Sequence, residues 1–408
     1  MKIHVLGINF YPELIGISVY TTEMCEYLIE KGHEITVFTG FPYYPSWRIK
    51  EDYKRKLFKT EEYKNIKIRR SYIFVPKNLK TINRIVHELS FIISSFLNVL
   101  FSKRPNILIT ISPPLGLGIA TLLISKIMRI PYIFHVQDLQ PDAVVELGMI
   151  DNKLLLKILY YIEGMIYKGA SKVSAISNGM IKKIMSKGIS RDKVLFFPNW
   201  VDIDFIKPQK KYNVFRKVNK LENKYIVLYS GNIGYKQGLD IILNVAQKTS
   251  KINDILYLIV GDGTYKKELI KKFKKTKPNN VKFLDVQSKE MLPYMVSAAD
   301  VCLVLQKKDV TDFALPSKLL NIMGCARPVI ACANTKSALY GLIGEIGCGK
   351  VVRPGDADQL CKEVLELYFN KEQGEVYGRR GRDFVVEHLS KDLILKRFEE
   401  EIISSLGI

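Results

Sequence analysis

Glycine and lysine gather directly after one β-branched run in the second half of the chain. The run at 225–230 is followed by Gly231-Asn-Ile-Gly-Tyr-Lys-Gln-Gly238 and then by a helical pattern up to Thr249. Exposed backbone N–H groups, a helix dipole and an ammonium group together suit a diphosphate. The Gly-Lys-Ser/Thr ending of a Walker A loop is missing. The segment therefore predicts a phosphate-binding turn formed by Gly231, Asn232, Gly234 and Lys236.

A second turn suited to an anion opens the helix expected at 317–325. Pro316 and Ser317 are residues that favour a helix start. Lys318 stands in the first turn, where a cation opposes the helix dipole. We therefore predict that Lys318 serves a bound anion; the alternative is a solvated lysine.

Three further glycines stand at expected strand-to-helix turns. Gly261 and Gly263 follow the run at 255–260, so they should lie at the same sheet edge as the phosphate turn. Gly16 lies before a helix expected to start near Ser18, where glycine lets a ligand approach the backbone. For all three, a purely structural turn is the alternative.

The first half of the chain offers an imidazole and a carboxylate at the end of the strand expected at 132–137. His135 and Asp138 could contact a sugar hydroxyl or handle a proton there. A hydrogen-bonded strand histidine is the alternative for His135.

Metal and cofactor signals are weak. Two Asp-x-Asp pairs occur, Asp202 with Asp204 and Asp356 with Asp358, in segments that predict loops. The six cysteines form no Cys-x-x-Cys pair and predict reduced core residues. We therefore expect no metal and no cofactor.

Short β-branched runs alternate with helical segments along most of the 408 residues. This alternation predicts parallel sheets covered by helices on both faces. The polar segment 198–224 interrupts the rhythm and is interpreted as an interdomain connection. We predict an α/β protein with two Rossmann-like, doubly wound domains facing across a cleft. The expected divisions are an acceptor-binding domain at 1–200, a donor-binding domain at 201–385 and a C-terminal helix at 386–408 packing back toward the first domain.

The formal net charge of +21 indicates attraction to an acidic partner or, equally, a solvated lysine-rich surface. A nucleic-acid partner is not expected, because no compact recognition module is visible. The segment 82–101 has apolar residues at helical spacing and basic residues on both flanks, as in an interfacial helix. A packed domain helix is the alternative. No run reaches the roughly 20 apolar residues of a membrane span.

Taken in order, the motifs resemble those of GT4-type glycosyltransferases with the GT-B fold, especially the enzymes that build capsule, colanic-acid and O-antigen polysaccharides. The likeness covers essentially the whole chain. Its markers are YPELIGISVYTTEMCEYLIEKGHEITVFTG (11–40), SPPLGLG (112–118), HVQDLQPDA (135–143), FPNWVD (197–202), YSGNIGYKQGL (229–239), GDG (261–263) and LPSKLLNIMGCARPVIA (315–331).

The resemblance implies retaining, metal-independent transfer from a UDP- or GDP-linked sugar to a glycan acceptor, commonly carried on polyprenyl diphosphate. It places Gly16 near the donor phosphates, the base beside Val286 and the acceptor near His135 and Asp138. It also implies a cytoplasmic enzyme on the inner face of the cell membrane, whose anionic surface would be a partner.

One departure from the family pattern concerns the donor sugar. Many members carry two glutamates seven residues apart, and those positions fall here on Phe313 and Asn321. Asn321 is retained as a candidate substrate-binding residue. The Arg and Lys that are common in the family's phosphate loop are Asn232 and Gln237 here. The phosphate charge should therefore rest more on Lys236 and Lys318.

Other classes remain as alternatives. A GT-B sugar-nucleotide 2-epimerase would share the architecture and act on the donor without an acceptor. A basic nucleic-acid-binding protein would account for the charge. A dinucleotide oxidoreductase is disfavoured because Gly-x-Gly-x-x-Gly is missing from the first half.

Overall fold

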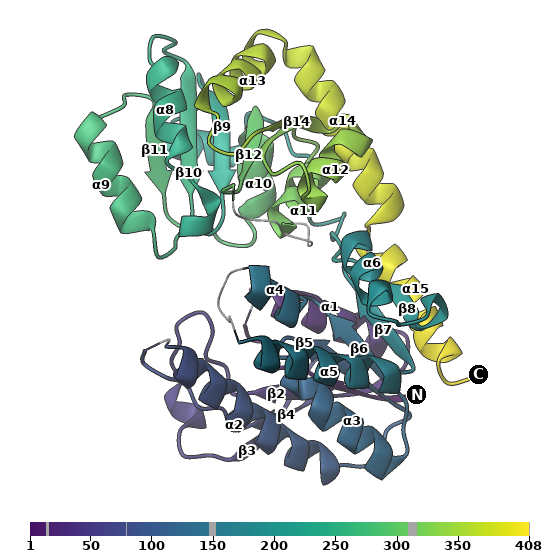
Figure 1. Cartoon of the computed structure of the whole chain (residues 1–408). Coiled ribbons are helices and arrows are strands. Elements are labelled where there is room, and N and C mark those ends of the chain that lie inside the picture. The colour runs from purple at the N-terminus through teal and green to yellow at the C-terminus, as the bar shows by residue number, and fades with distance from the viewer. Residues whose placement is uncertain (14–15, 79, 147–151, 309–315, 408) are drawn as a thin grey trace. The chain divides into compact units, whose positions relative to one another are not determined.

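The chain divides into two compact units, and the computed structural model describes it except for residues 14–15, 79, 147–151, 309–315 and 408 (Figure 1). Unit 1 comprises Met1–Pro198 together with Leu395–Ile408, and unit 2 comprises Asn199–Ile394. Each unit is built on its own sheet.

The sheet of unit 1 has the strand order β3-β4-β2-β1-β5-β6-β7-β8 in the described part of the chain. All neighbours pair in parallel except β3 with β4. Its strands β5 and β6 are buried at every residue, as expected for strands covered on both faces. The strands are β1 (Lys2–Leu6), β2 (Glu34–Gly40), β3 (Phe58–Tyr63), β4 (Ile66–Ser71), β5 (Ile107–Ser112), β6 (Tyr132–Val136), β7 (Lys172–Ala175) and β8 (Val194–Phe196).

The helices of unit 1 lie on both faces of this sheet. The connection from β1 to β2 runs toward the β3 edge of the sheet, so a right-handed crossover puts α1 on one face. The later connections run toward the β8 edge, so right-handed crossovers put α2, α3 and α5 on the other face. The helices are α1 (Ile17–Glu30), α2 (Thr81–Leu100), α3 (Gly116–Met128), α4 (Gln140–Glu146), α5 (Lys153–Gly169), α6 (Asn178–Ser186) and the C-terminal α15 (Lys391–Ser404).

The end of α15 belongs to unit 1 and is held there by polar and aromatic contacts. The Glu399 carboxylate lies 2.8 Å from His33 Nε2. The Phe398 ring stacks on Phe197, with centroids 3.8 Å apart. These contacts join the end of the chain to α1 and to the segment after β8.

The sheet of unit 2 has the order β11-β10-β9-β12-β13-β14, with every described pair parallel. Its strands are β9 (Tyr225–Ser230), β10 (Ile255–Val260), β11 (Val281–Leu284), β12 (Val301–Leu305), β13 (Val329–Cys332) and β14 (Gly349–Val352). Its helices are α7 (Val214–Asn219), α8 (Ile241–Lys248), α9 (Lys266–Thr276), α10 (Leu292–Ala298), α11 (Ser317–Gly324), α12 (Ala338–Ile346), α13 (Ala357–Phe369) and α14 (Lys371–His388).

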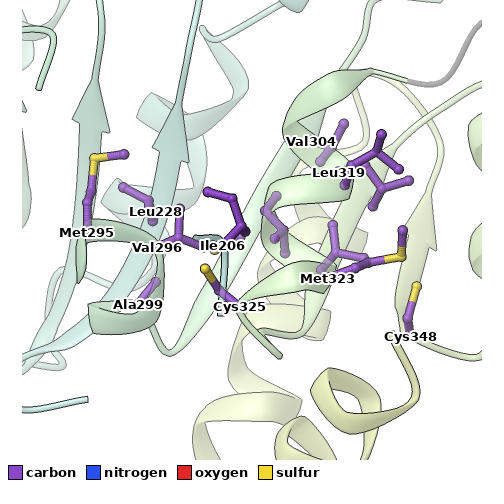
Figure 2. Close-up of a cluster of buried hydrophobic side chains, with 14 of the residues drawn as sticks. Ile206, Leu228, Met295, Val296, Ala299, Val304, Leu319, Met323, Cys325 and Cys348 are labelled. Carbon is purple, nitrogen blue, oxygen red and sulfur yellow. The ribbon is translucent and has the colours of Figure 1, made fainter. Parts of the chain in front are cut away.

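Two apolar cores lie on the two faces of this second sheet. One packs α10 and α11 against the strands, and Figure 2 shows Leu228, Val304, Leu319 and Met323 within it. The other packs α8, α9 and α13 against the opposite face. Leu319 is fully buried, so truncation to alanine should cost about 2–5 kcal/mol. This core fixes α11 through Leu319, and it thereby also fixes Lys318, the preceding residue of that helix.

The segment predicted as an interdomain connection is more ordered than the sequence indicated. Residues 199–224 belong to unit 2 and include the short helix α7. Its Arg216 is buried, with the guanidinium donating to the Ala298 carbonyl and to Asp300. Phe215 and Leu221 join the apolar core of unit 2, and the buried Arg216–Asp300 ion pair adds to their packing.

Candidate active site

The phosphate turn predicted from the sequence follows β9, at the point where the chain reverses direction across the sheet. From β9 the chain runs outward to β10 and β11, and then returns to β12 on the other side of β9. Ligands of open α/β sheets bind at the carboxyl ends of the strands beside such a reversal. The turns after β9 and β10 and the start of α11 supply most of the residues predicted for the donor.

The turns after β9 and β10 are locked together by backbone hydrogen bonds. The Gly231 N–H donates to the Val260 carbonyl at 3.0 Å, and the Ile233 N–H to the Asp262 carbonyl at 2.8 Å. Gly261 has φ +147°, and a Cβ there would overlap the Gly231 carbonyl oxygen. Gly263 has φ +157°, and a Cβ there would overlap the Ile233 carbonyl oxygen. The geometry of these two glycines favours the structural alternative: they let one loop support the other.

Lys318 reaches this supported loop from the first turn of α11. Its Nζ donates to the Tyr229 hydroxyl at 3.0 Å and lies 4.2 Å from the centre of the Tyr229 ring. A Cβ built on Gly231 would lie 3.2 Å from the same Nζ. The Tyr229 hydroxyl in turn donates to the Asn232 carbonyl at 2.6 Å. The structure therefore brings Lys318, Gly231 and Asn232 together through a tyrosine that the sequence analysis did not select.

The charge on Lys318 has no acidic partner among the residues that the structure describes, which leave out 309–315. Burial lowers the pKa of the Lys318 ammonium to about 8. An anion beside Gly231 would supply the missing negative charge and raise that pKa again.

The remaining donor candidates lie around this centre with looser constraints. Lys236 is exposed, and its carbonyl accepts from the Lys307 N–H at 2.9 Å. Gly234 is buried, next to the side chains of Asn232 and Gln237. The sequence analysis missed Lys307, although its position directly after the end of β12 is a usable signal.

The two ends of the predicted donor site are accessible. Pro316 and Ser317 begin α11, with Ser317 exposed, and Asn321 is half-buried one turn later. Val286 is 67% exposed beyond the end of β11. Phe313, the other position of the family's glutamate pair, lies outside the described residues.

A pocket of about 370 Å³ adjoins the phosphate turn. Residues from the end of that turn, from the segment after β12 and from the loop at 354–355 line it. The side-chain carbonyl oxygen of Gln237 is buried there without a hydrogen-bond partner among the described residues. A polar ligand group at this point would satisfy it.

In unit 1, His135 is enclosed in β6. Its Nδ1 lies 2.9 Å from Ser174 Oγ, and its Nε2 lies 2.9 Å from the Gln137 side-chain nitrogen. Burial lowers its pKa to about 3, so the ring is neutral near pH 7. Both ring nitrogens have partners, and this favours the structural alternative over proton transfer. Asp138, two residues beyond the strand, is exposed.

Gly16 is the N-cap of α1 and has φ +65°. A Cβ on it would meet nothing within 4 Å, so its backbone is open to approach. This is compatible with a phosphate at the helix start.

Glu13, which the sequence analysis did not select, organises the loop that follows β2. One carboxylate oxygen accepts from the Tyr43 and Tyr44 N–H groups at 2.8 and 2.7 Å. The other accepts from the Asn9 side chain at 2.8 Å. Burial raises the pKa of this carboxyl, while the three donors oppose the rise. Glu13 thus fixes the start of the 43–47 segment.

The Asp-x-Asp pairs serve local structure. Asp202 accepts from two backbone N–H groups of its own turn, and Asp356 caps α13. No group of three or more His, Cys, Asp or Glu side chains in the described ranges could hold a metal ion.

Comparison with known proteins agrees with the fold. The pattern of "Glycosyl transferases group 1" matches residues 211–384, and that of "Glycosyltransferase Family 4" matches residues 15–205. This chain belongs to the GT4 glycosyltransferases and has the GT-B fold. The predicted family and fold class are confirmed.

Individual relatives cover the whole chain. The chain is 33% identical to the putative colanic acid biosynthesis glycosyl transferase WcaI of Escherichia coli (strain K12), over 98% of this chain and 100% of that protein. Among solved structures, Anabaena HepE in complex with UDP gives a TM-score of 0.75 at 15% identity, over 99% of this chain and 100% of that one. Sucrose-phosphate synthase of Thermosynechococcus elongatus gives 0.76 at 16% identity, over 100% and 99%.

Proposed function

We propose that this glycosyltransferase moves a sugar from a UDP- or GDP-linked donor to a glycan acceptor during the synthesis of a surface polysaccharide, with retention at the anomeric carbon. The observation that carries the proposal is Lys318, whose ammonium lies at the glycine turn after β9 with no acidic partner among the described residues. The relative WcaI, named for colanic acid biosynthesis, supports the pathway class. HepE, described with UDP and with UDP-glucose, supports a nucleotide sugar.

The donor diphosphate would lie between Lys318 and the backbone N–H groups of Asn232 and Gly234, because those of Gly231 and Ile233 already donate to the turn after β10. As the glycosidic bond to phosphate breaks, negative charge grows on the leaving oxygen. A fixed ammonium in a partly buried site stabilises this growing charge in the transition state more than it stabilises the intact donor. Lys236 and Lys307, both exposed at the same sheet edge, would add weaker attraction.

Retention needs no separate base from the protein. The leaving phosphate oxygen can take the proton of the acceptor hydroxyl on the face from which it departs. His135, neutral and enclosed, is not required for this step. Asp138 and the segment fixed by Glu13 would instead orient the acceptor's hydroxyl groups.

For the acceptor we propose a glycan linked to polyprenyl diphosphate. Such a substrate stays in the bilayer, so the enzyme would work in the cytoplasm as a peripheral protein on the inner face of the cell membrane. No described helix is long and apolar enough to cross a membrane.

Replacement of Lys318 tests this proposal directly. Lys318→Ala should lower turnover at least tenfold, and a loss on the order of 3 kcal/mol of transition-state stabilisation would correspond to about 100-fold. Lys274→Ala, at an exposed position on α9, is the matched control and should leave turnover unchanged. Equal turnover in both variants would remove Lys318 from the mechanism.

The donor and the reaction class need separate measurements. A thermal-shift panel of UDP, GDP and their sugars should raise the unfolding midpoint for the correct nucleotide by mass action. Incubating UDP-GlcNAc with enzyme alone separates transfer from the 2-epimerase alternative, which would convert the donor without an acceptor. A gel-shift assay tests the nucleic-acid alternative.

A further inference from the structure

Helix α2 packs against the rest of unit 1 with a mixed side inward: Phe91 and Val99 are fully buried there beside polar side chains. The buried hydroxyl, imidazole and amide groups hydrogen-bond to residues at and after the end of β4. Ser94 Oγ donates to the Tyr72 carbonyl at 2.6 Å, and the Asn98 amide donates to Ser71 Oγ at 2.9 Å. His87 Nδ1 bonds the carbonyl of Phe74 in the same way. These contacts fix which side of the helix faces the protein.

The opposite side of α2 is apolar and exposed. Ile82 is 74% exposed and Ile93 is 61% exposed, values usual for lysine rather than isoleucine. The stripe predicted from helical spacing therefore faces outward instead of filling a core. Its exposed large members are Ile82, Ile85, Val86, Leu89, Ile93 and Leu97, continued by Phe101 at the C-cap.

Two neighbouring helices extend this surface. Helix α3 packs beside α2, and α5 packs beside α3, on the same face of the sheet (Figure 1). The exposed apolar residues are Ile119, Leu123 and Ile127 on α3, and Leu154, Leu155, Ile158, Tyr161 and Met165 on α5. We call the exposed apolar residues of the three helices the apolar face. A soluble surface rarely gathers so many large apolar side chains without a partner.

The charges on and beside these helices are mostly positive. Five basic residues stand within α2, α3 and α5, and the acids there are Glu88, half-buried, and Glu163, buried. Further exposed basic residues flank the helices, at Lys77, Lys80, Lys103, Arg104 and Arg129. Apolar side chains beside basic ones suit the interface of an anionic bilayer.

We propose that the apolar face is a docking surface for an anionic phospholipid bilayer, with α2, α3 and α5 lying flat in the interface. The proposed lipid-linked acceptor gives a reason for membrane docking. The evidence for docking is independent of it, because it is the exposed apolar side of α2 and the basic residues around it. A second copy of this chain is a poorer occupant, since a twofold contact would bring two basic surfaces together.

Binding to vesicles tests the proposal with the full chain. The protein should sediment with vesicles of phosphatidylcholine and phosphatidylglycerol at a 7:3 ratio in low salt. Binding should be at least tenfold weaker to phosphatidylcholine alone. The double variant Ile85→Glu with Ile93→Glu should bind the anionic vesicles at least tenfold more weakly than the parent. The double variant Val218→Glu with Phe369→Glu places the same charges at exposed apolar positions of unit 2, and it should bind as the parent does.

A fluorescence variant keeps the test valid if the glutamate variant fails to fold. Ile93→Trp should shift its tryptophan emission to shorter wavelength when anionic vesicles are added. Val218→Trp should show no such shift beyond that of the two native tryptophans. No shift for Ile93→Trp would overturn the proposal.

Two further outcomes would also overturn it. In sedimentation velocity without lipid, the parent could be a dimer and the Ile85→Glu, Ile93→Glu variant a monomer. If the parent also failed to bind vesicles, the apolar face would be a protein interface. If the unit 2 control variant lost as much vesicle binding as the α2 variant, binding would reflect general attraction between the basic protein and the anionic lipid. UDP-induced thermal shift should be the same in parent and variants, which separates failure of docking from failure of the proposed donor site.

Discussion

The candidate sites of the two units differ in how the described residues satisfy their polar groups. In unit 1, Glu13 accepts three hydrogen bonds, and His135 has a partner on each ring nitrogen. In unit 2, Lys318 is partly buried, and its Nζ donates to the Tyr229 hydroxyl with no acidic partner among the described residues. A buried charge without a partner of opposite sign costs stability unless a ligand supplies one. The difference favours unit 2 as the proposed site of the anionic donor, whereas the polar groups of unit 1 hold its own loops.

The largest expected effect comes from the glycine that supports the phosphate turn. Gly261→Ala should destabilise unit 2 by about 3 kcal/mol or more, because φ is +147° and the new Cβ would overlap the Gly231 carbonyl. It should also abolish the UDP-induced thermal shift. Gly341→Ala on α12 is the control, since its Cβ would meet nothing within 4 Å. A fully stable Gly261→Ala variant would show that the two loops are not locked together.

Removing the Glu13 carboxylate should damage unit 1 alone. Glu13→Ala leaves the buried Tyr43 N–H without its acceptor and should lower the free energy of unfolding by about 2–3 kcal/mol. Glu13→Gln keeps one acceptor oxygen and should cost less than half as much. Chemical denaturation measures both. If the two variants lose acceptor affinity without losing stability, Glu13 contacts the substrate instead.

Replacing Lys318 should stabilise the empty protein while abolishing donor binding. Because burial lowers the pKa of the ammonium to about 8, the folded state disfavours the charged form that the unfolded state prefers. This penalty is fully present below pH 8 and fades as the pH rises toward the unfolded value of 10.5. The free energy of unfolding of Lys318→Met at pH 7 should therefore be about 2 kcal/mol higher than that of the parent, and this gain should shrink above pH 8. A destabilised variant at pH 7 would mean that the protein compensates this charge.

The smallest effect is expected at His135. His135→Asn removes a ring packed against Phe197 and should cost some stability. Its turnover, measured below the unfolding temperature, should stay within about threefold of the parent. A loss of 100-fold or more in a folded variant would restore His135 as a proton carrier and weaken the contrast between the two units.

Much of the fold could be predicted from the sequence, and the misses share a cause. The β3–β4 hairpin was missed because β3 is a half-exposed edge strand with charged residues at alternate positions. β14 was missed because it is only four residues long and begins with glycine and lysine. In each case long-range pairing, rather than the local pattern, makes the strand.

For the candidate site, the loops were predictable and their partners were not. The glycines after β9 and β10 and the cation at the start of α11 are local signals with local physical reasons. Tyr229 gave no signal, because it is one aromatic residue in an apolar strand. Asn321 and Val286 stay predictions, since no described contact ties them to the donor centre.

By itself, the sequence determined two Rossmann-like units and predicted two turns suited to phosphate, because periodicity and glycine placement act over a few residues. The ordered set of motifs determined the family. Only the tertiary structure decided that Lys318 meets Tyr229, 89 residues away, and thereby lies over Gly231. It also decided that α2 turns His87, Ser94 and Asn98 inward and leaves Ile85 and Ile93 exposed. A helical pattern gives the spacing of a stripe, but packing and hydrogen bonds with the neighbouring elements decide which side is buried.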